Sequence, residues 1–184
     1  MFIDPENLYH IYNRGNNKSR LFFQERNYDF FLKKVVNHFS RHVDLLAYCL
    51  MPNHFHFMIY AKETIDSNKF SGSLRTLLSS YTRAIQNQEK RTGSLFQQNT
   101  KAAEIYGYAE NCFHYIHQNP LKAGIVKKIE DWRYSSFNEY WKGEKGICNI
   151  ELAHTLLNLE GNPDKFYAQS CHHLSGGTTS FLRP

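Results

Sequence analysis

The ten residues from Met51 to Tyr60 (MPNHFHFMIY) constrain this chain more than any other stretch. Pro52 and Asn53 are turn formers, and the apolar run after them is typical of a buried strand. Side chains alternate between the two faces of a strand, so His54 and His56 point to the same face. Two imidazoles side by side supply half of a divalent metal site. An ordinary strand whose histidines hydrogen-bond to neighbours is the alternative, and a third polar ligand is needed to decide.

Length and composition place the chain among globular proteins. Its 184 residues suit one domain with a sizeable core, and 41% hydrophobic with 15% aromatic residues argues against disorder. The formal charge of +5 favours an anionic partner. The four cysteines form no C-x-x-C pair, which predicts a reducing, cytoplasmic location without disulfides. No signal peptide and no membrane span is expected from the apolar segments.

The order of periodic segments predicts the fold class. Strand and helix patterns alternate as strand, helix, strand, strand, helix, strand, which is the ferredoxin-like βαββαβ arrangement of the α+β class. Its antiparallel sheet carries both helices on one face and leaves the other face free for a site. The second helix is expected to begin at a cap formed by Ser71 or Ser73. The expected elements are strand 8–12, helix 27–41, strand 43–50, strand 54–60, a helix to about 91, and strand 102–105.

A third helix, predicted over 106–119 and ended by Pro120, lies outside that unit. Tyr115 and Asn119 are four residues apart, so they share one shoulder of its apolar side. Asn119 is therefore the inward polar group. The remaining polar residues of this helix are expected to point away from the apolar side: His114, His117 and Gln118.

Tyr115 is a candidate nucleophile. A phenol attacks poorly near neutral pH because its pKa is about 10, but it becomes useful where a divalent metal polarises a phosphodiester. From the residues alone the alternative stays open that Tyr115, one of twelve tyrosines, packs at the edge of the core.

Several segments together resemble the single-tyrosine HUH transposases, and within them the branch of REP-associated tyrosine transposases. The similarity extends over roughly residues 8–142, with the motifs in the family's order. The segments that carry it are Tyr12–Asn17 (YNRGNN), Met51–His56 (MPNHFH), Tyr115–Val126 (YIHQNPLKAGIV) and Trp132–Ser136 (WRYSS).

This resemblance implies a mechanism as well as a ferredoxin-like fold with an added catalytic helix. His54 and His56 would bind Mg²⁺ or Mn²⁺, with Asn119 as third ligand. Tyr115 would cleave single-stranded DNA, becoming joined to the 5′ phosphate and leaving a 3′ hydroxyl that can later be religated. The implied substrate is a DNA hairpin with flanking single strand, such as a transposon end or a repetitive extragenic palindrome. The implied activity is DNA transposition by strand cleavage and transfer.

Other residues are assigned by charge, position or departure from the family pattern. Asn99 and Thr100 stand where the family often carries an arginine and an aromatic, so local recognition of DNA is expected to differ there. A solvated surface is the alternative for each basic residue. The candidates for contacts with the DNA backbone are Arg14, Lys18, Arg20, Arg75, Arg83, Lys101 and Lys122.

The chain is expected to divide at about residue 145. Residues 1–145 form the catalytic domain, and 146–184 form a helical extension and tail packed on the same domain. Asn149 caps one helix of this extension, a second covers 163–173, and residues 176–184 form a loose tail. Cys171, His172 and His173 could suggest a metal site, but a polar tail is the simpler interpretation.

Two other functions remain open. The first is a non-catalytic, domesticated protein that grips hairpin DNA, although the presence of Tyr115, both histidines and Asn119 argues against it. The second is a hydrolase in which the metal activates water and Tyr115 is structural. Whether the protein is a monomer or a homodimer, with a site in cis or in trans, is also open.

Overall fold

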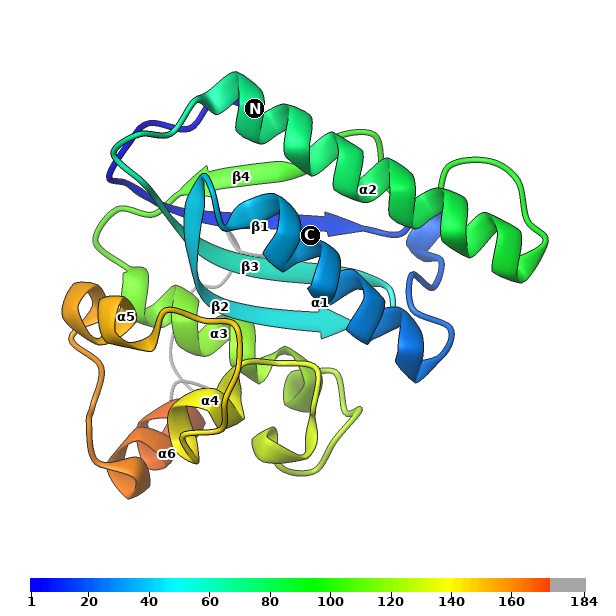
Figure 1. Ribbon diagram of the computed structural model, residues 1–184. Helices are drawn as coiled ribbons and strands as arrows, with labels where there is room; N and C mark the ends of the chain where they lie inside the picture. Colours follow the sequence, from blue (N-terminus) through cyan, green and yellow to red (C-terminus); the bar gives the residue numbers. More distant parts are fainter. Residues whose placement is uncertain (173–184) are drawn as a thin grey trace.

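A four-stranded antiparallel sheet forms the centre of the protein in the computed structural model, which describes residues 1–172 (Figure 1). Its strand order is β2-β3-β1-β4, and β3 pairs antiparallel with both β1 and β2. This order confirms the predicted ferredoxin-like βαββαβ arrangement. The strands are β1 (Leu8–Arg14), β2 (Val43–Met51), β3 (His54–Ala61) and β4 (Lys101–Glu104).

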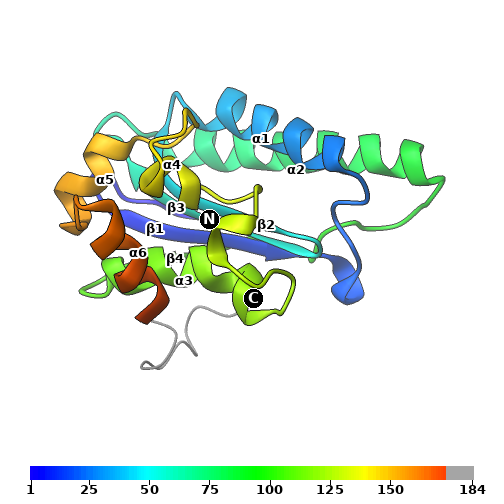
Figure 2. The same ribbon diagram turned by 90° about the horizontal axis from the view of Figure 1, so that it is seen from below.

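Helices cover both faces of this sheet (Figure 2). Helices α1 and α2 lie together on one face, and α3 lies on the other, over β2 and β3. We call the face under α3 the site face. The helices are α1 (Glu25–Phe39), α2 (Ser67–Glu89), α3 (Ala109–Lys122), α4 (Phe137–Trp141), α5 (Ile150–Leu157) and α6 (Pro163–His172), with short 3₁₀ helices at Asn16–Lys18 and Ile129–Asp131.

The alternation of side chains along β3 separates two apolar cores. Phe55, Phe57 and Ile59 are buried in the core beneath α1 and α2. Met58 belongs to the second core, beneath α3. Because the period of a strand is two, the same alternation directs His54 and His56 to the site face, as predicted.

The start of α2 differs from the prediction. The helix begins at Ser67 rather than after Ser71 or Ser73, because Asp66 is the cap. Its carboxylate oxygen accepts hydrogen bonds from the backbone N–H groups of Asn68 and Lys69, each at 3.0 Å. An aspartate cap satisfies donors that would otherwise be unpaired at the first turn.

Pro120 does not end α3, which begins at Ala109 and runs on to Lys122. A proline has no N–H, so the carbonyl of Ile116 loses its usual helical partner. The side-chain nitrogen of Asn119 compensates by donating to the carbonyls of Tyr115 at 2.8 Å and Ile116 at 3.3 Å. The amide therefore replaces the missing backbone donor and lets the helix continue.

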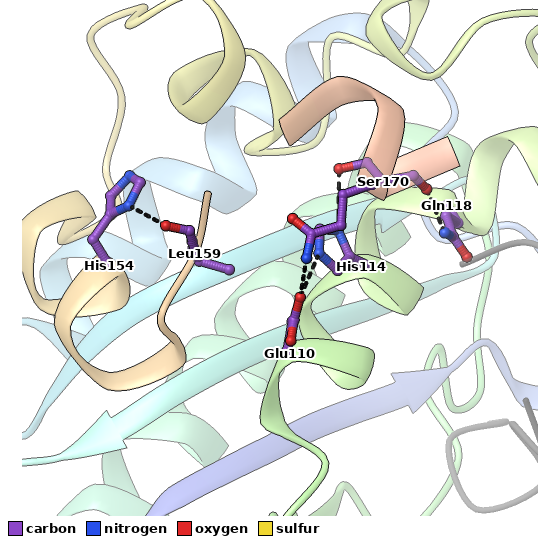
Figure 3. Close-up of polar contacts among 7 residues, drawn as sticks. Glu110, His114, Gln118, His154, Leu159 and Ser170 are labelled. Carbon is purple, nitrogen blue, oxygen red and sulfur yellow. Dashed lines mark hydrogen bonds and ion pairs between the residues drawn. The ribbon is translucent and has the colours of Figure 1, made fainter. Parts of the chain in front are cut away.

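The outer side of α3 is buried, contrary to the prediction that His114, His117 and Gln118 point away from the packed side. All three side chains are at most 1% exposed. Helices α4 and α6 cover this side, and α6 contributes Ser170, whose hydroxyl hydrogen-bonds with His114 and whose carbonyl accepts from Gln118 (Figure 3). The covering elements are distant in sequence, so the helix pattern alone carried no sign of them.

The extension after residue 145 follows the predicted helices as far as the structure describes it. Asn149 caps α5 by accepting from the backbone N–H of Leu152, and α6 occupies the expected range. His173 and the predicted tail at 176–184 lie outside the described residues. All four cysteines of residues 1–172 have free thiols. None of the helices found in that range combines the length and apolar character that crossing a bilayer requires.

Candidate functional site

The register of β1 against β3 gathers polar side chains on the site face. Arg14 lies opposite His54, Tyr12 lies opposite His56, and His10 lies opposite Met58. Directly opposed residues of an antiparallel pair point to the same side of the sheet. The site face therefore carries two rows of polar groups, one from each strand.

His56 is held by a second histidine. Its Nδ1 lies 2.8 Å from Nε2 of His10, and both side chains are fully buried. Burial lowers the pKa of His10 to about 3 and holds the pKa of His56 well below its ordinary value. Both rings are therefore neutral at pH 7, the form that binds a metal.

The remaining nitrogen of His56 carries the strongest sign of a ligand. Nε2 is buried and has no hydrogen-bond partner among residues 1–172. If His56 donates its Nδ1–H to His10, then Nε2 keeps its lone pair and faces the site. Buried polar atoms are nearly always satisfied, so an orphaned imidazole nitrogen on this face fits a metal ligand.

His54 is arranged in the same way by a different partner. Its Nδ1 lies 2.7 Å from the side-chain oxygen of Asn53, to which the ring N–H donates. Burial and the charge of Arg14 lower the pKa of His54 to about 4, while a hydrogen bond with Asn119 opposes them. His54 is thus neutral, and Asn119 lies beside it.

Helix α3 brings the tyrosine to these histidines. The ring centroid of Tyr115 lies 5.6 Å from that of His56, edge to face, and its side chain is 6% exposed. The ammonium of Lys122 lies 5.5 Å from the centre of the tyrosine ring. Asn119 uses its nitrogen for the helix carbonyls, so Oδ1 is the atom of this amide that could act as a ligand. One chain thus brings together Tyr115, Asn119 and both histidines.

The donor set suits a divalent ion. No group of three or more His, Cys, Asp and Glu side chains that could hold a metal is found in the described part of the chain. A site here would rely on the two imidazoles and on the amide oxygen of Asn119 as third donor. Nitrogen and oxygen ligands of this kind match first-row divalent metals, and the orphaned Nε2 of His56 supplies the observation that the residues fit.

A basic loop, residues 14–20, borders the site. Arg14, Lys18 and Arg20 line a hollow of about 460 Å³ whose wall includes His54 and Ala123 just after α3. Gly15 shapes the turn, because a Cβ there would lie 1.9 Å from the Ser19 carbonyl oxygen. The loop therefore presents three cations next to the imidazole of His54.

The other basic candidates divide between the two faces. Lys101 pairs with Tyr12, and Lys122 lies over Tyr115, so both belong to the site face. Arg75 and Arg83 lie on α2, on the opposite layer, and the structure does not bring them to the site.

Sequence reasoning missed two residues of this site. His10 was not singled out, because its place opposite Met58 depends on a strand register that the sequence does not state. Asn53 was assigned only as a turn former, yet it also orients His54. The available signal was periodicity, since His10, Tyr12 and Arg14 alternate along β1 on one face.

The family model for IS200-like transposases matches residues 6–119, more than half of the chain. The match starts before β1 and ends at Asn119, so it includes all four residues that converge. The chain belongs to the IS200-like transposase family. The resemblance inferred from the motifs is confirmed.

Two relatives of this IS200-like transposase carry the more specific name. A protein of Haemophilus influenzae named as a REP-associated tyrosine transposase is 27% identical over 123 residues, covering 61% of this chain and 68% of that protein. A solved structure of a REP-associated tyrosine transposase bound to a REP hairpin matches with a TM-score of 0.62 at 21% identity. That match covers 80% of this chain and 87% of the other, and it confirms the fold.

Proposed function

We propose that this IS200-like transposase cleaves and rejoins single-stranded DNA that carries a hairpin, through a 5′-phosphotyrosine intermediate. The observation that carries the proposal is the convergence of Tyr115 and Asn119 on the buried, neutral pair His54 and His56. All of them belong to one chain, which supports a site assembled in cis.

The residues divide the chemistry as follows. His54 and His56, through Nε2, and Asn119, through Oδ1, would hold Mg²⁺ or Mn²⁺, which when bound polarises the scissile phosphate. The phenol oxygen of Tyr115 attacks phosphorus and releases its proton to solvent. The bond from phosphorus to the 3′ oxygen breaks, and that oxygen takes up a proton.

Rejoining reverses these steps. A 3′ hydroxyl attacks the phosphotyrosine, a new phosphodiester forms, and Tyr115 leaves as the free phenol. The reaction needs no external energy source, because the phosphotyrosine ester preserves the energy of the broken bond.

The hairpin substrate is proposed from the solved relative, which is bound to a REP hairpin. In this chain the basic loop offers three cations beside His54 for the phosphates next to the scissile bond. Lys101 and Lys122 extend the positive charge across the site face. Affinity for DNA is then expected to fall steeply with salt, as counterion release requires.

The test is an adduct assay. The protein is incubated with a labelled oligonucleotide that contains a hairpin and single-stranded flanks, with Mn²⁺ or Mg²⁺, and then denatured. We expect a covalent protein–DNA adduct that is lost in Tyr115→Phe and weakened in His54→Ala. Chelation of the metal should abolish the adduct and Mn²⁺ should restore it. Tyr106→Phe is the matched control, because Tyr106 is 71% exposed and outside the site.

Two outcomes would contradict the proposal. Binding without any cleavage would favour a domesticated hairpin-binding protein. Cleavage that persists in Tyr115→Phe would favour a hydrolase in which Tyr115 is structural.

A further inference from the structure

A second groove lies on the α2 side of the sheet, away from the histidines. It has a volume of about 880 Å³ and runs between α2 and the segment 94–100, which leads into β4. Figure 1 shows α2 running alongside β4, with their connection looping out beyond the end of the helix. This volume is within the range typical of ligand sites. We call it the amide groove.

The lining of the amide groove is polar but nearly uncharged. Amide and hydroxyl side chains dominate it, and Arg75 is the one charged side chain among the described residues that line it. A surface for the phosphate backbone needs several cations, whereas amides and hydroxyls are suited to base edges. The chemistry of the groove therefore fits nucleobases better than a run of phosphates.

Three consecutive amide side chains could hydrogen-bond with base edges, and we call them the reading groups. Gln97, Gln98 and Asn99 are exposed, and their side chains make no hydrogen bond within residues 1–172. Each amide offers a donor and an acceptor side by side, the arrangement that pairs with the edge of a base. Their hydrogen-bonding capacity is thus available to a ligand.

The backbone that carries these amides is fixed to β1. The N–H of Gln97 donates to the carbonyl of Arg14 at 2.9 Å. Asn13 donates from its side chain to the carbonyl of Gln97 at 3.2 Å and to the hydroxyl of Thr100 at 2.8 Å. The reading groups therefore lie on an ordered support, which lowers the entropy lost on binding.

The same contacts connect the amide groove to the site. Asn13 faces the groove, while its neighbour Arg14 faces His54, because adjacent residues of β1 point to opposite sides. Lys101 follows Thr100 and returns to the site face. A strand of DNA leaving the site past Arg14 and Lys101 has only the β4 edge to cross before it reaches the groove.

We propose that the amide groove binds unpaired bases in the single-stranded flank of the DNA substrate. Gln97, Gln98 and Asn99 read the base edges, and Arg75 neutralises one phosphate at the wall. This inference rests on the proposed function, since it assigns a place to the flank of that same substrate.

The test compares two hairpins with the same stem, one blunt and one with a ten-nucleotide flank on either side, by fluorescence anisotropy without metal. The variant replaces Gln97, Gln98 and Asn99 by alanine. We expect at least a tenfold loss of affinity for the flanked hairpin and no change for the blunt one. Asn37→Ala combined with Asn87→Ala is the control, because both amides are exposed and lie outside the groove.

A change in the DNA instead of the protein serves as a control for misfolding of the triple variant. A flank of abasic sites should weaken binding to the unaltered protein as much as the triple variant does. The abasic flank and the triple variant combined should lower the affinity no more than either change alone. That result would indicate that both changes remove the same contacts. Additive losses would overturn the inference.

Arg75 allows a second, independent experiment. Arg75→Ala should lower the salt dependence of flanked-hairpin binding by about one unit of slope. Lys33→Ala, at an exposed position of α1 outside the groove lining, should leave it unchanged. If the triple variant binds the blunt hairpin normally and still gains as much affinity from the flank as the unaltered protein does, this inference is overturned and the proposed function is not. Failure to bind either hairpin would overturn the proposed function itself.

Discussion

The ring nitrogens of His54 and His56 decide what the site can bind. His56 and His54 each use Nδ1 for a neighbour, His10 in one case and Asn53 in the other, and Nε2 of His56 then has no partner among residues 1–172. A partner on the second ring nitrogen fixes the tautomer and orientation of a ligating histidine. His10 is therefore a positioning residue for His56.

Replacing His10 tests this role. His10→Ala should weaken Mn²⁺ binding by about 10- to 100-fold, the usual effect of losing such a partner. His10→Gln, which can still accept a hydrogen bond, should recover part of the loss. Calorimetric titration of the DNA-free protein with Mn²⁺ measures both, with Tyr12→Phe as control. An unchanged dissociation constant in His10→Ala would show that His10 serves packing alone.

We expect Asn119 to have two separable tasks, with its amide oxygen binding the metal and its amide nitrogen donating to the helix carbonyls. Asn119→Asp keeps a ligand oxygen but removes the donor to the Tyr115 and Ile116 carbonyls. We expect Mn²⁺ binding to persist while the free energy of unfolding falls by about 1–2 kcal/mol. Asn119→Ala should lose Mn²⁺ binding and also the stability that the amide donor supplies. Titration with Mn²⁺ and urea unfolding distinguish the two tasks, and equal metal affinity in all three proteins would remove Asn119 from the ligand set.

At the level of elements, α3 is held in place by the segment Trp132–Ser136, which runs along the free edge of β2. The carbonyl of Tyr134 accepts from the N–H of Leu50 at 2.9 Å. The hydroxyl of Ser136 accepts from the N–H of Tyr48 at 2.9 Å and lies 2.7 Å from Nε2 of His117 on α3. One serine thus connects the edge of the sheet to α3, the helix that carries Tyr115.

Ser136→Ala should therefore destabilise the fold. The substitution leaves the N–H of Tyr48 and the ring of His117 without this partner in a fully buried position. We expect a loss of about 2 kcal/mol in the free energy of unfolding, measured in urea. Ser79→Ala, at an exposed position of α2, is the control. A loss no larger than that of the control would contradict the connection.

The sequence allowed prediction of each element whose pattern is local. Period-two alternation placed His54 and His56 on one face, and period 3.6 identified α1. The outer side of α3 was mispredicted because its cover, α4 and α6, comes from distant and partly short segments. The end of α3 was also predicted wrongly. The rule that a proline ends a helix takes no account of a side chain, here that of Asn119, that can replace the missing backbone donor. The convergence of Tyr115 on the histidines came from family resemblance, because periodicity does not fix how helices dock.

At the scale of the whole molecule, α3 is enclosed between the sheet and the C-terminal helices. Polar side chains fill the contact between α3 and α6, where Glu110, His114 and Gln118 face the turn that bears Ser170 (Figure 3). A helix buried on both sides needs such groups to be satisfied by partners. Helix α6 thus completes the environment of the helix that carries Tyr115.

This enclosure makes stability depend on pH. The folded protein keeps several buried histidines neutral, and burial lowers the pKa of His117 to about 3. An unfolded histidine titrates near 6.5, so below that pH the unfolded chain takes up protons that the folded protein refuses. Stability is therefore fully present above about pH 6.5 and falls as the pH drops toward 3. Each such histidine contributes up to about 1.4 kcal/mol per pH unit in this window. His10, His54 and His56 act in the same direction.

Urea unfolding between pH 7.5 and 4.5 measures this dependence. The free energy of unfolding should decrease steadily below pH 6.5. In His117→Gln the slope should be shallower by about one proton, even if the variant is less stable at every pH, because the slope counts protons and not contacts. A slope identical to that of the unaltered protein would mean that His117 binds its proton equally in both states. That result would contradict a fully enclosed α3, since exclusion from water is the main cause of the lowered pKa of His117, with the charge of His114 as a second cause.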